Sequence, residues 1–153
     1  MTTADDYILT TFHITGTQEG GKFEPTKESI LVQHGYESDA AAWINDYHSK
    51  PQLQHPPYEE EKPMALQLAD LGYDIWFGNN RGTEYSQKHR TLSAKDDPSY
   101  WSFSWSEMGL YDAPANIDLI KEQAATDKIF YVGYSQGTVQ MFYALSHIEE
   151  SYL

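Results

Sequence analysis

The stretch that decides the fold reads Ile129-Phe130-Tyr131-Val132-Gly133-Tyr134-Ser135-Gln136-Gly137-Thr138. Its first four residues form a compact apolar run, which predicts a strand buried on both faces. From Thr138 to Leu145 apolar residues recur at helical spacing. Because Gly-X-Ser-X-Gly lies between the two, Ser135 is expected on a sharp turn that joins a strand to a helix.

This turn supplies part of what a serine needs to act as a nucleophile. A hydroxyl attacks poorly unless a base removes its proton and fixed donors stabilise the oxyanion that forms. The strained backbone at Ser135 needs small neighbours where the chain crosses itself, and Gly133 and Gly137 meet that need. The following helix aims its free amides at the serine, so the Gln136 amide is the expected oxyanion donor. From spacing alone, a tight structural turn without catalytic role is the alternative.

A second oxyanion donor is expected from a loop that follows an earlier strand. The apolar run Ile30-Leu31-Val32 predicts such a strand, and it ends at His34-Gly35. The next residue, Tyr36, would contribute its backbone N–H to the oxyanion.

The remaining pattern places this turn in one α/β domain without repeats. We predict further strands at 7–14 and 73–77 and a helix at 64–71 that stops at Gly72. Residues 46–63, rich in proline and glutamate, predict a solvated loop. Strands that alternate with helices predict a sheet that is largely parallel after its opening pair.

Helix start signals recur between the third strand and the Ser135 turn. Ser104 and Glu107 have the spacing of a capping box, and Asp112 before Pro114 marks a second start. One broken helix or two consecutive helices are therefore predicted as far as Lys121. The inner face is expected to carry Ile117, Ile120 and Ala124.

Composition excludes several classes of partner. The 153 residues include 40% hydrophobic side chains and carry a formal charge of −13, which repels phosphate backbones and argues against a nucleic-acid partner. There is no cysteine, and the six histidines show no metal-ligand spacing, so no metal site is predicted. No apolar run approaches the roughly 20 residues of a membrane span, and the first residues lack the features of a signal peptide. The compartment stays open.

A series of segments in fixed order carries a wider resemblance. They are Thr2-Thr3-Ala4-Asp5-Asp6-Tyr7-Ile8-Leu9, Gln33-His34-Gly35, Leu68-Ala69-Asp70-Leu71-Gly72-Tyr73-Asp74-Ile75-Trp76-Phe77-Gly78-Asn79-Asn80-Arg81-Gly82, and the ranges 100–108, 111–118 and 131–138. In these segments the chain resembles the acid lipase family of α/β-hydrolases, which includes gastric and lysosomal acid lipases, sterol ester hydrolases and triacylglycerol lipases. The resemblance implies a mostly parallel central sheet with helices on both faces. It also implies cleavage of fatty acyl esters of glycerol or sterol without a metal or organic cofactor.

The resemblance also implies roles for single residues. Ser135 matches the nucleophile, Gln136 and Tyr36 the oxyanion hole, and the supporting positions are His34, Gly35, Gly133 and Gly137. The family usually has leucine where Tyr36 stands and histidine where Tyr134 stands. A backbone donor tolerates the first change, but a bulky phenol would narrow the acyl pocket. Both changes therefore bear on substrate preference more than on reaction type.

The acid and histidine of a catalytic triad are expected beyond this sequence. In this fold they follow the serine, and 18 residues follow Ser135. His147 lies roughly 18 Å further along the predicted helix, at about 1.5 Å per residue. His34 is expected to hold the oxyanion loop instead of serving as the base. Residues 1–153 are accordingly expected to form a partial lipase domain without the C-terminal strands and cap. Relatives usually carry a signal or anchor segment before the position of Met1, so the sequence is expected to be shortened at both ends.

Such a chain would leave the edge of strand 129–132 unpaired, which makes that edge a candidate surface for a partner or for self-association. The alternative to an ester hydrolase is therefore a catalytically inactive remnant that binds acyl lipid or a protein partner. Two other motifs are interpreted as structural. Arg81 is expected to tie down loop carbonyls and a carboxylate such as Asp112. Packing in the core or in loops is the predicted role of the aromatic residues Tyr100, Trp101, Phe103 and Trp105, and contact with lipid is the alternative.

Overall fold

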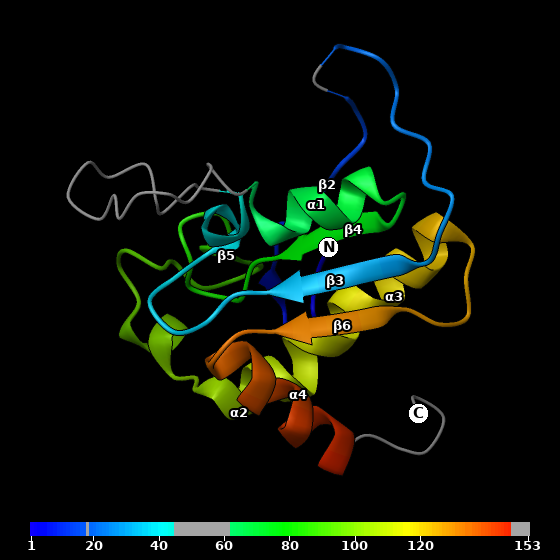
Figure 1. Ribbon diagram of the computed structural model, residues 1–153. Helices are drawn as coiled ribbons and strands as arrows, with labels where there is room; N and C mark the ends of the chain where they lie inside the picture. Colours follow the sequence, from blue (N-terminus) through cyan, green and yellow to red (C-terminus); the bar gives the residue numbers. More distant parts are fainter. Residues whose placement is uncertain (18, 45–61, 148–153) are drawn as a thin grey trace, which may run out of the picture.

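The computed structural model in Figure 1 describes residues 1–17, 19–44 and 62–147. Its main sheet has the strand order β2-β4-β3-β6, with β2 at Phe12–His13, β3 at Ser29–Gln33, β4 at Asp74–Gly78 and β6 at Phe130–Gly133. β3 runs parallel to β4 and to β6, and β2 runs antiparallel to β4. The arrows of β3 and β6 point the same way in Figure 1. The predicted α/β sheet, largely parallel after its opening pair, is confirmed, and β3 of that pair is itself parallel to β4 and β6.

Helices join the parallel strands and cover both faces of the sheet. They are α1 at Met64–Asp70, α2 at Trp105–Glu107, the π-helix η5 at Met108–Asp112, α3 at Ala113–Ala124 and α4 at Gln136–His147. Ala65 and Ala69 of α1 pack on one face with side chains that include Ile30 and Val32. On the other face Ile120 of α3 packs with Leu31 and Trp76. Alternation along β3 therefore supplies apolar residues to both layers.

The segment from Ser104 to α3 begins as predicted and is interrupted once. Ser104 N donates to Glu107 Oε2 at 2.7 Å, and the Ser104 side chain accepts the Glu107 backbone N–H, which completes the capping box. Ser106 N also donates to Ser104 Oγ at 3.2 Å. The π-helix η5 separates α2 from α3, so the prediction of a broken helix is confirmed. None of the helices in the described part of the chain is long and apolar enough to cross a membrane.

The prediction of one strand at 7–14 is wrong. β1 at Tyr7–Ile8 pairs with β5 at Lys88–His89 in a separate two-stranded sheet, whereas β2 joins the main sheet. Between β1 and β2 the backbone of Thr10 binds side chains instead of a neighbouring strand. Thr10 N donates to Ser86 Oγ at 3.0 Å, and Asn79 Nδ2 donates to the Thr10 carbonyl at 2.9 Å. Two 3-10 helices, η1 at Ala40–Trp43 and η4 at Pro98–Trp101, were also not predicted.

β6 is less buried than the apolar run 129–132 predicted. Phe130 is 55% exposed, and the other strand residues are half-buried. The reason is the strand order, since β6 pairs with β3 on one side and is the last strand of the described sheet. Residues 46–61 of the predicted solvated loop lie outside the described residues.

Candidate active site

Ser135 lies on the turn between β6 and α4 in a left-handed backbone conformation, with φ of +52°. A residue other than glycine adopts this backbone conformation only under strain, and strained residues are concentrated at functional sites. The flanking glycines allow the turn to close. A Cβ on Gly133 would lie 2.7 Å from the Gly137 carbonyl carbon, and one on Gly137 would lie 2.6 Å from the Gln33 carbonyl oxygen. The serine is exposed at the tip of this turn.

The loop after β3 lies directly against the turn. Tyr134 N donates to the Gln33 carbonyl at 3.0 Å, which extends the pairing of β6 with β3 beyond the strands. A Cβ on Gly35 would lie 3.1 Å from Ser135 Cβ, so this glycine lets the loop approach the serine closely. The structure thus brings the segment 34–36 and the segment 133–137 together. Tyr36 and Tyr134 are 71% and 68% exposed, and the Tyr134 ring lies against this loop, since a Cβ on Gly35 would lie 3.0 Å from Tyr134 Cδ1.

His34 is buried, and both of its ring nitrogens have partners. The Asn80 N–H donates to Nε2 at 3.1 Å, so that nitrogen carries no proton in the neutral ring. The proton is then on Nδ1, which donates to the Gly35 carbonyl at 2.7 Å. Burial lowers the pKa of His34 and outweighs the hydrogen bond to Gly35 and the charge of Asp39, which act to raise it. A ring held in this way orients the loop and has no nitrogen free to accept the serine proton.

The other described histidines are also engaged elsewhere. His13 Nε2 contacts Asp74 Oδ1 at 2.5 Å, His89 Nδ1 accepts the Thr91 N–H at 3.1 Å, and the His147 ring stacks on Tyr143 with centroids 3.9 Å apart. In the ranges 1–17, 19–44 and 62–147, no cluster of three His, Cys, Asp or Glu residues that could hold a metal is found. His48 and His55 lie outside the described residues.

An open pocket of about 570 Å³ adjoins the turn. Its lining includes Tyr36 and Gln136, whose backbone amides are the oxyanion donors predicted from the sequence. Trp101, Phe103 and Met108 also line it. Ser135 is not part of the lining but directly precedes Gln136. A larger pocket of about 670 Å³ lies at the opposite ends of the parallel strands, where Ser29 and Asp74 begin β3 and β4, and the serine turn does not line it.

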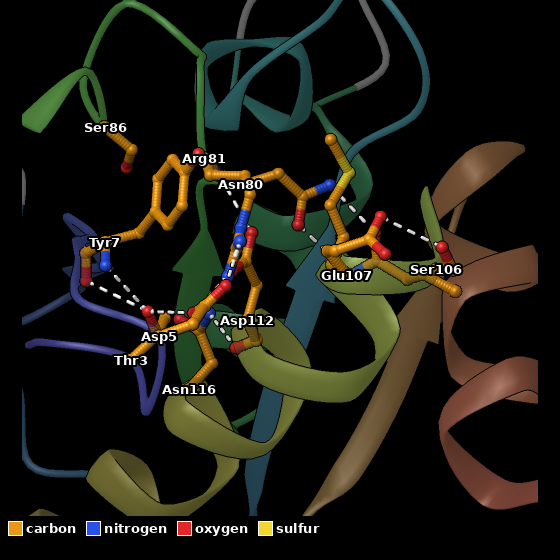
Figure 2. Close-up of polar contacts among 12 residues, drawn as sticks. Thr3, Asp5, Tyr7, Asn80, Arg81, Ser86, Ser106, Glu107, Asp112 and Asn116 are labelled. Atoms are coloured by element: carbon orange, nitrogen blue, oxygen red, sulfur yellow. Dashed lines mark hydrogen bonds and ion pairs between the residues drawn. The ribbon is translucent and has the colours of Figure 1, made fainter. Parts of the chain in front are cut away.

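Arg81 contacts the Asp112 carboxylate as predicted, whereas the guanidinium contacts found among the described residues go to carboxylates and not to the predicted loop carbonyls. Its Nε donates to Asp112 Oδ1 at 2.8 Å, and its terminal nitrogens contact Asp5 at 2.5 and 2.8 Å, as Figure 2 shows. Burial alone would lower the pKa of Arg81, but the two carboxylates raise it above its ordinary value, so the guanidinium stays charged. Tyr100 and Phe103 pack in the cluster with Tyr7 as predicted. Trp101 and Trp105 are more than 40% exposed, but each packs edge to face on another ring, Trp101 on Tyr100 and Trp105 on Tyr143.

Sequence reasoning did not identify Asn79, Asn80 and Gln140 as residues that contact the site. All three are buried, and Asn80 contacts both His34 and Gln140. One signal was present in the sequence, because two consecutive amides directly follow a strand whose residues are all buried. Polar side chains at the carboxyl end of a parallel strand commonly mark a functional edge of the sheet.

The fold, the sheet order and the turn at Ser135 define the class of this protein. The family described as "alpha/beta hydrolase fold" matches residues 28–151, and a second family, "Partial alpha/beta-hydrolase lipase region", matches residues 1–47. The chain belongs to the α/β-hydrolase fold family.

Among known proteins the chain is similar to lipases. It is 38% identical to mouse lipase member M over 98% of its length and 40% identical to mouse lipase member K over 94%. It is 35% identical to human lysosomal acid lipase/cholesteryl ester hydrolase over 97%. The matches cover 32%, 33% and 34% of these relatives, so the chain spans about a third of their length.

Proposed function

We propose that this chain carries the nucleophile and the oxyanion hole of a serine ester hydrolase that acts on fatty acyl esters of glycerol or sterol. The observation that carries the proposal is Ser135, held at φ of +52° between β6 and α4 with the Gly35 loop against it. Gln136 is the first residue of α4, where an amide has no carbonyl one turn earlier to bind. The names of the lipase relatives support the substrate class.

In the proposed reaction Ser135 Oγ attacks the ester carbonyl and forms a tetrahedral oxyanion. The N–H groups of Gln136 and Tyr36 donate to this oxyanion, and the positive end of α4 stabilises its charge. Collapse of the intermediate releases the alcohol and leaves an acyl-serine, which water then cleaves. Because the described histidines have other partners, the proposal assigns the base and the acid to residues outside the described part of the chain.

Labelling with a fluorophosphonate probe tests the nucleophile. We expect an adduct on Ser135 in residues 1–153 when imidazole is added as an external base, mapped by mass spectrometry. Ser135→Ala should abolish the adduct, and Ser146→Ala, which removes another exposed serine near the end of α4, should leave it unchanged. Ester turnover by this chain alone should be small, since deacylation also needs a positioned base.

One observation favours a second candidate, a non-catalytic chain that binds acyl lipid or a protein partner. Large apolar side chains are exposed along α4 and at the start of β6, among them Phe142 at 69% and Phe130 at 55%. A well-folded sample that remains unlabelled at Ser135 with imidazole present would support this candidate and contradict the hydrolase proposal.

A further inference from the structure

Two buried amide side chains connect the segment after β4 to the helix α4. Asn80 Nδ2 donates to Gln140 Oε1 at 2.8 Å, and Gln140 Nε2 donates to Asn80 Oδ1 at 3.2 Å. Asn80 is 1% exposed and Gln140 is fully buried. A reciprocal amide pair in such a place has one favourable geometry, because a displaced partner would leave buried donors and acceptors unsatisfied.

The backbone of Asn80 reaches the other side of the candidate site. Its N–H donates to His34 Nε2, and His34 Nδ1 donates to the Gly35 carbonyl. The Gly35 carbonyl and the Tyr36 N–H belong to one planar trans peptide and point in opposite directions. The bond that holds the carbonyl therefore also fixes the direction of the Tyr36 N–H.

The far end of the same loop is held by Asn79, the residue before Asn80. Asn79 Oδ1 accepts the Ala40 N–H at 2.9 Å at the start of η1. The loop from His34 to Ala40 is thus bound at both ends to the consecutive pair Asn79 and Asn80. Figure 2 shows Asn80 next to Arg81.

We infer that Asn80 is a positioning residue that sets the separation of the two oxyanion donors. Its side chain holds Gln140, which lies about one turn after Gln136 on the rigid helix α4, and its backbone holds the loop that presents the Tyr36 amide. The inference rests on the proposed function. Oxyanion donors act within a few tenths of an ångström, and displacement by about 1 Å costs up to about a hundredfold in rate.

A swap of the two amides tests this role. Asn80→Gln adds one methylene to the pair and Gln140→Asn removes one, so each single variant misaligns the amides, while the double variant restores the total length. Asn116→Gln is the matched control. Asn116 is also a fully buried amide, but it binds the Asp112 carbonyl and the Thr11 hydroxyl, away from the loop and α4.

Two measurements are made on folded samples of all five chains. The first is the rate of Ser135 labelling by the fluorophosphonate probe with imidazole. The second is the NMR signature of the site: the ¹⁵N shifts of the His34 ring, which report its tautomer, and the amide shifts of Tyr36 and Gln136. We expect each single variant to label about tenfold to a hundredfold more slowly and to shift these resonances. The double variant should recover both readouts, and Asn116→Gln should change neither.

The two proposals fail in different ways. A folded wild-type chain without labelling contradicts the hydrolase function, and the NMR signature still decides the role of Asn80. Single variants that keep the wild-type signature, or a double variant that does not recover it, overturn the positioning role. If neither single variant folds, the double variant decides: wild-type shifts at Tyr36 and Gln136 support the inference, and altered shifts overturn it.

Discussion

Gly137 has no space for a side chain, and the atoms that surround it belong to the backbone. A Cβ at this position would lie 2.6 Å from the Gln33 carbonyl oxygen and 2.8 Å from that of His34. Neither atom can rotate away as a side chain would. We therefore expect Gly137→Ala to lower the free energy of unfolding by about 1–3 kcal/mol, as overpacking typically does. Urea unfolding of the folded chain measures this change.

Gly16→Ala provides the matched control for that substitution. The nearest atom to its added Cβ, the Gly21 carbonyl oxygen, would lie 3.5 Å away, which is ordinary van der Waals contact. Its effect should stay within about 0.5 kcal/mol. Equal losses of unfolding free energy in the two variants would show that the close backbone approach at Gly137 is not the reason why glycine is needed there.

The protonation of His34 gives a second prediction for a single residue. Burial lowers the pKa of its ring below the ordinary 6.5, so the native state holds it neutral where the unfolded chain already binds a proton. Stability from this group is present above pH 6.5 and is lost as the pH falls through that value towards the native pKa. An NMR titration of the His34 ring should give a midpoint below 6.5, and one at or above it would contradict the assigned burial and tautomer.

Three segments distant in the sequence depend on the buried charge of Arg81. It follows β4 and contacts Asp112 at the end of η5 and Asp5 before β1. Arg81→Met would leave Asp112 buried without its counter-charge. Loss of one partner of a buried pair typically costs about 3–5 kcal/mol, and we expect a loss of this size in urea unfolding.

An exposed arginine of the same chain serves for comparison. Arg90 contacts Asp6 at 3.5 Å, and both side chains are largely exposed. Arg90→Met removes the same charge and should cost no more than about 1 kcal/mol. A comparable loss in both variants would mean that net charge, and not the buried contacts, accounts for the effect of Arg81→Met.

The elements that local sequence specifies were predicted, and those that depend on distant partners were not. The capping box at Ser104 and the end of α1 at Gly72, where φ is +94°, need only neighbouring residues. By contrast, the break between β1 and β2 depends on Ser86 and Asn79, some 70 positions away. The same holds for the pair of Asn80 and Gln140, which are separated by 60 positions and carry no periodic signal.

The exposure of β6 could not be predicted from the sequence either, because an apolar run does not show which place its strand takes in the sheet. As the last strand of the described sheet, β6 presents backbone groups without a strand partner on that side. Phe130 on β6 and Phe142 on α4, the helix that follows it, are exposed. The described residues therefore combine an exposed strand edge with the chain's formal charge of −13, which opposes association.

We expect self-association through this edge to increase with salt. The Debye length falls from about 30 Å at 0.01 M to about 3 Å at 1 M ionic strength, which screens the repulsion but leaves apolar contact and strand pairing intact. Sedimentation velocity of residues 1–153 should show the average mass rising across this range. Phe130→Lys places a charge on the edge and should suppress the rise.

The opposite edge of the sheet supplies the control. Phe12 of β2 is 40% exposed, and Phe12→Lys adds the same charge there. If the chains associate through β6, the mass of Phe12→Lys should rise with salt nearly as that of the wild type does. The two Lys variants have equal net charge, so a difference between them reflects the position of the charge. Suppression by Phe12→Lys alone would place the contact on β2, and a mass that does not change with salt would show that charge repulsion is not what keeps the chains apart.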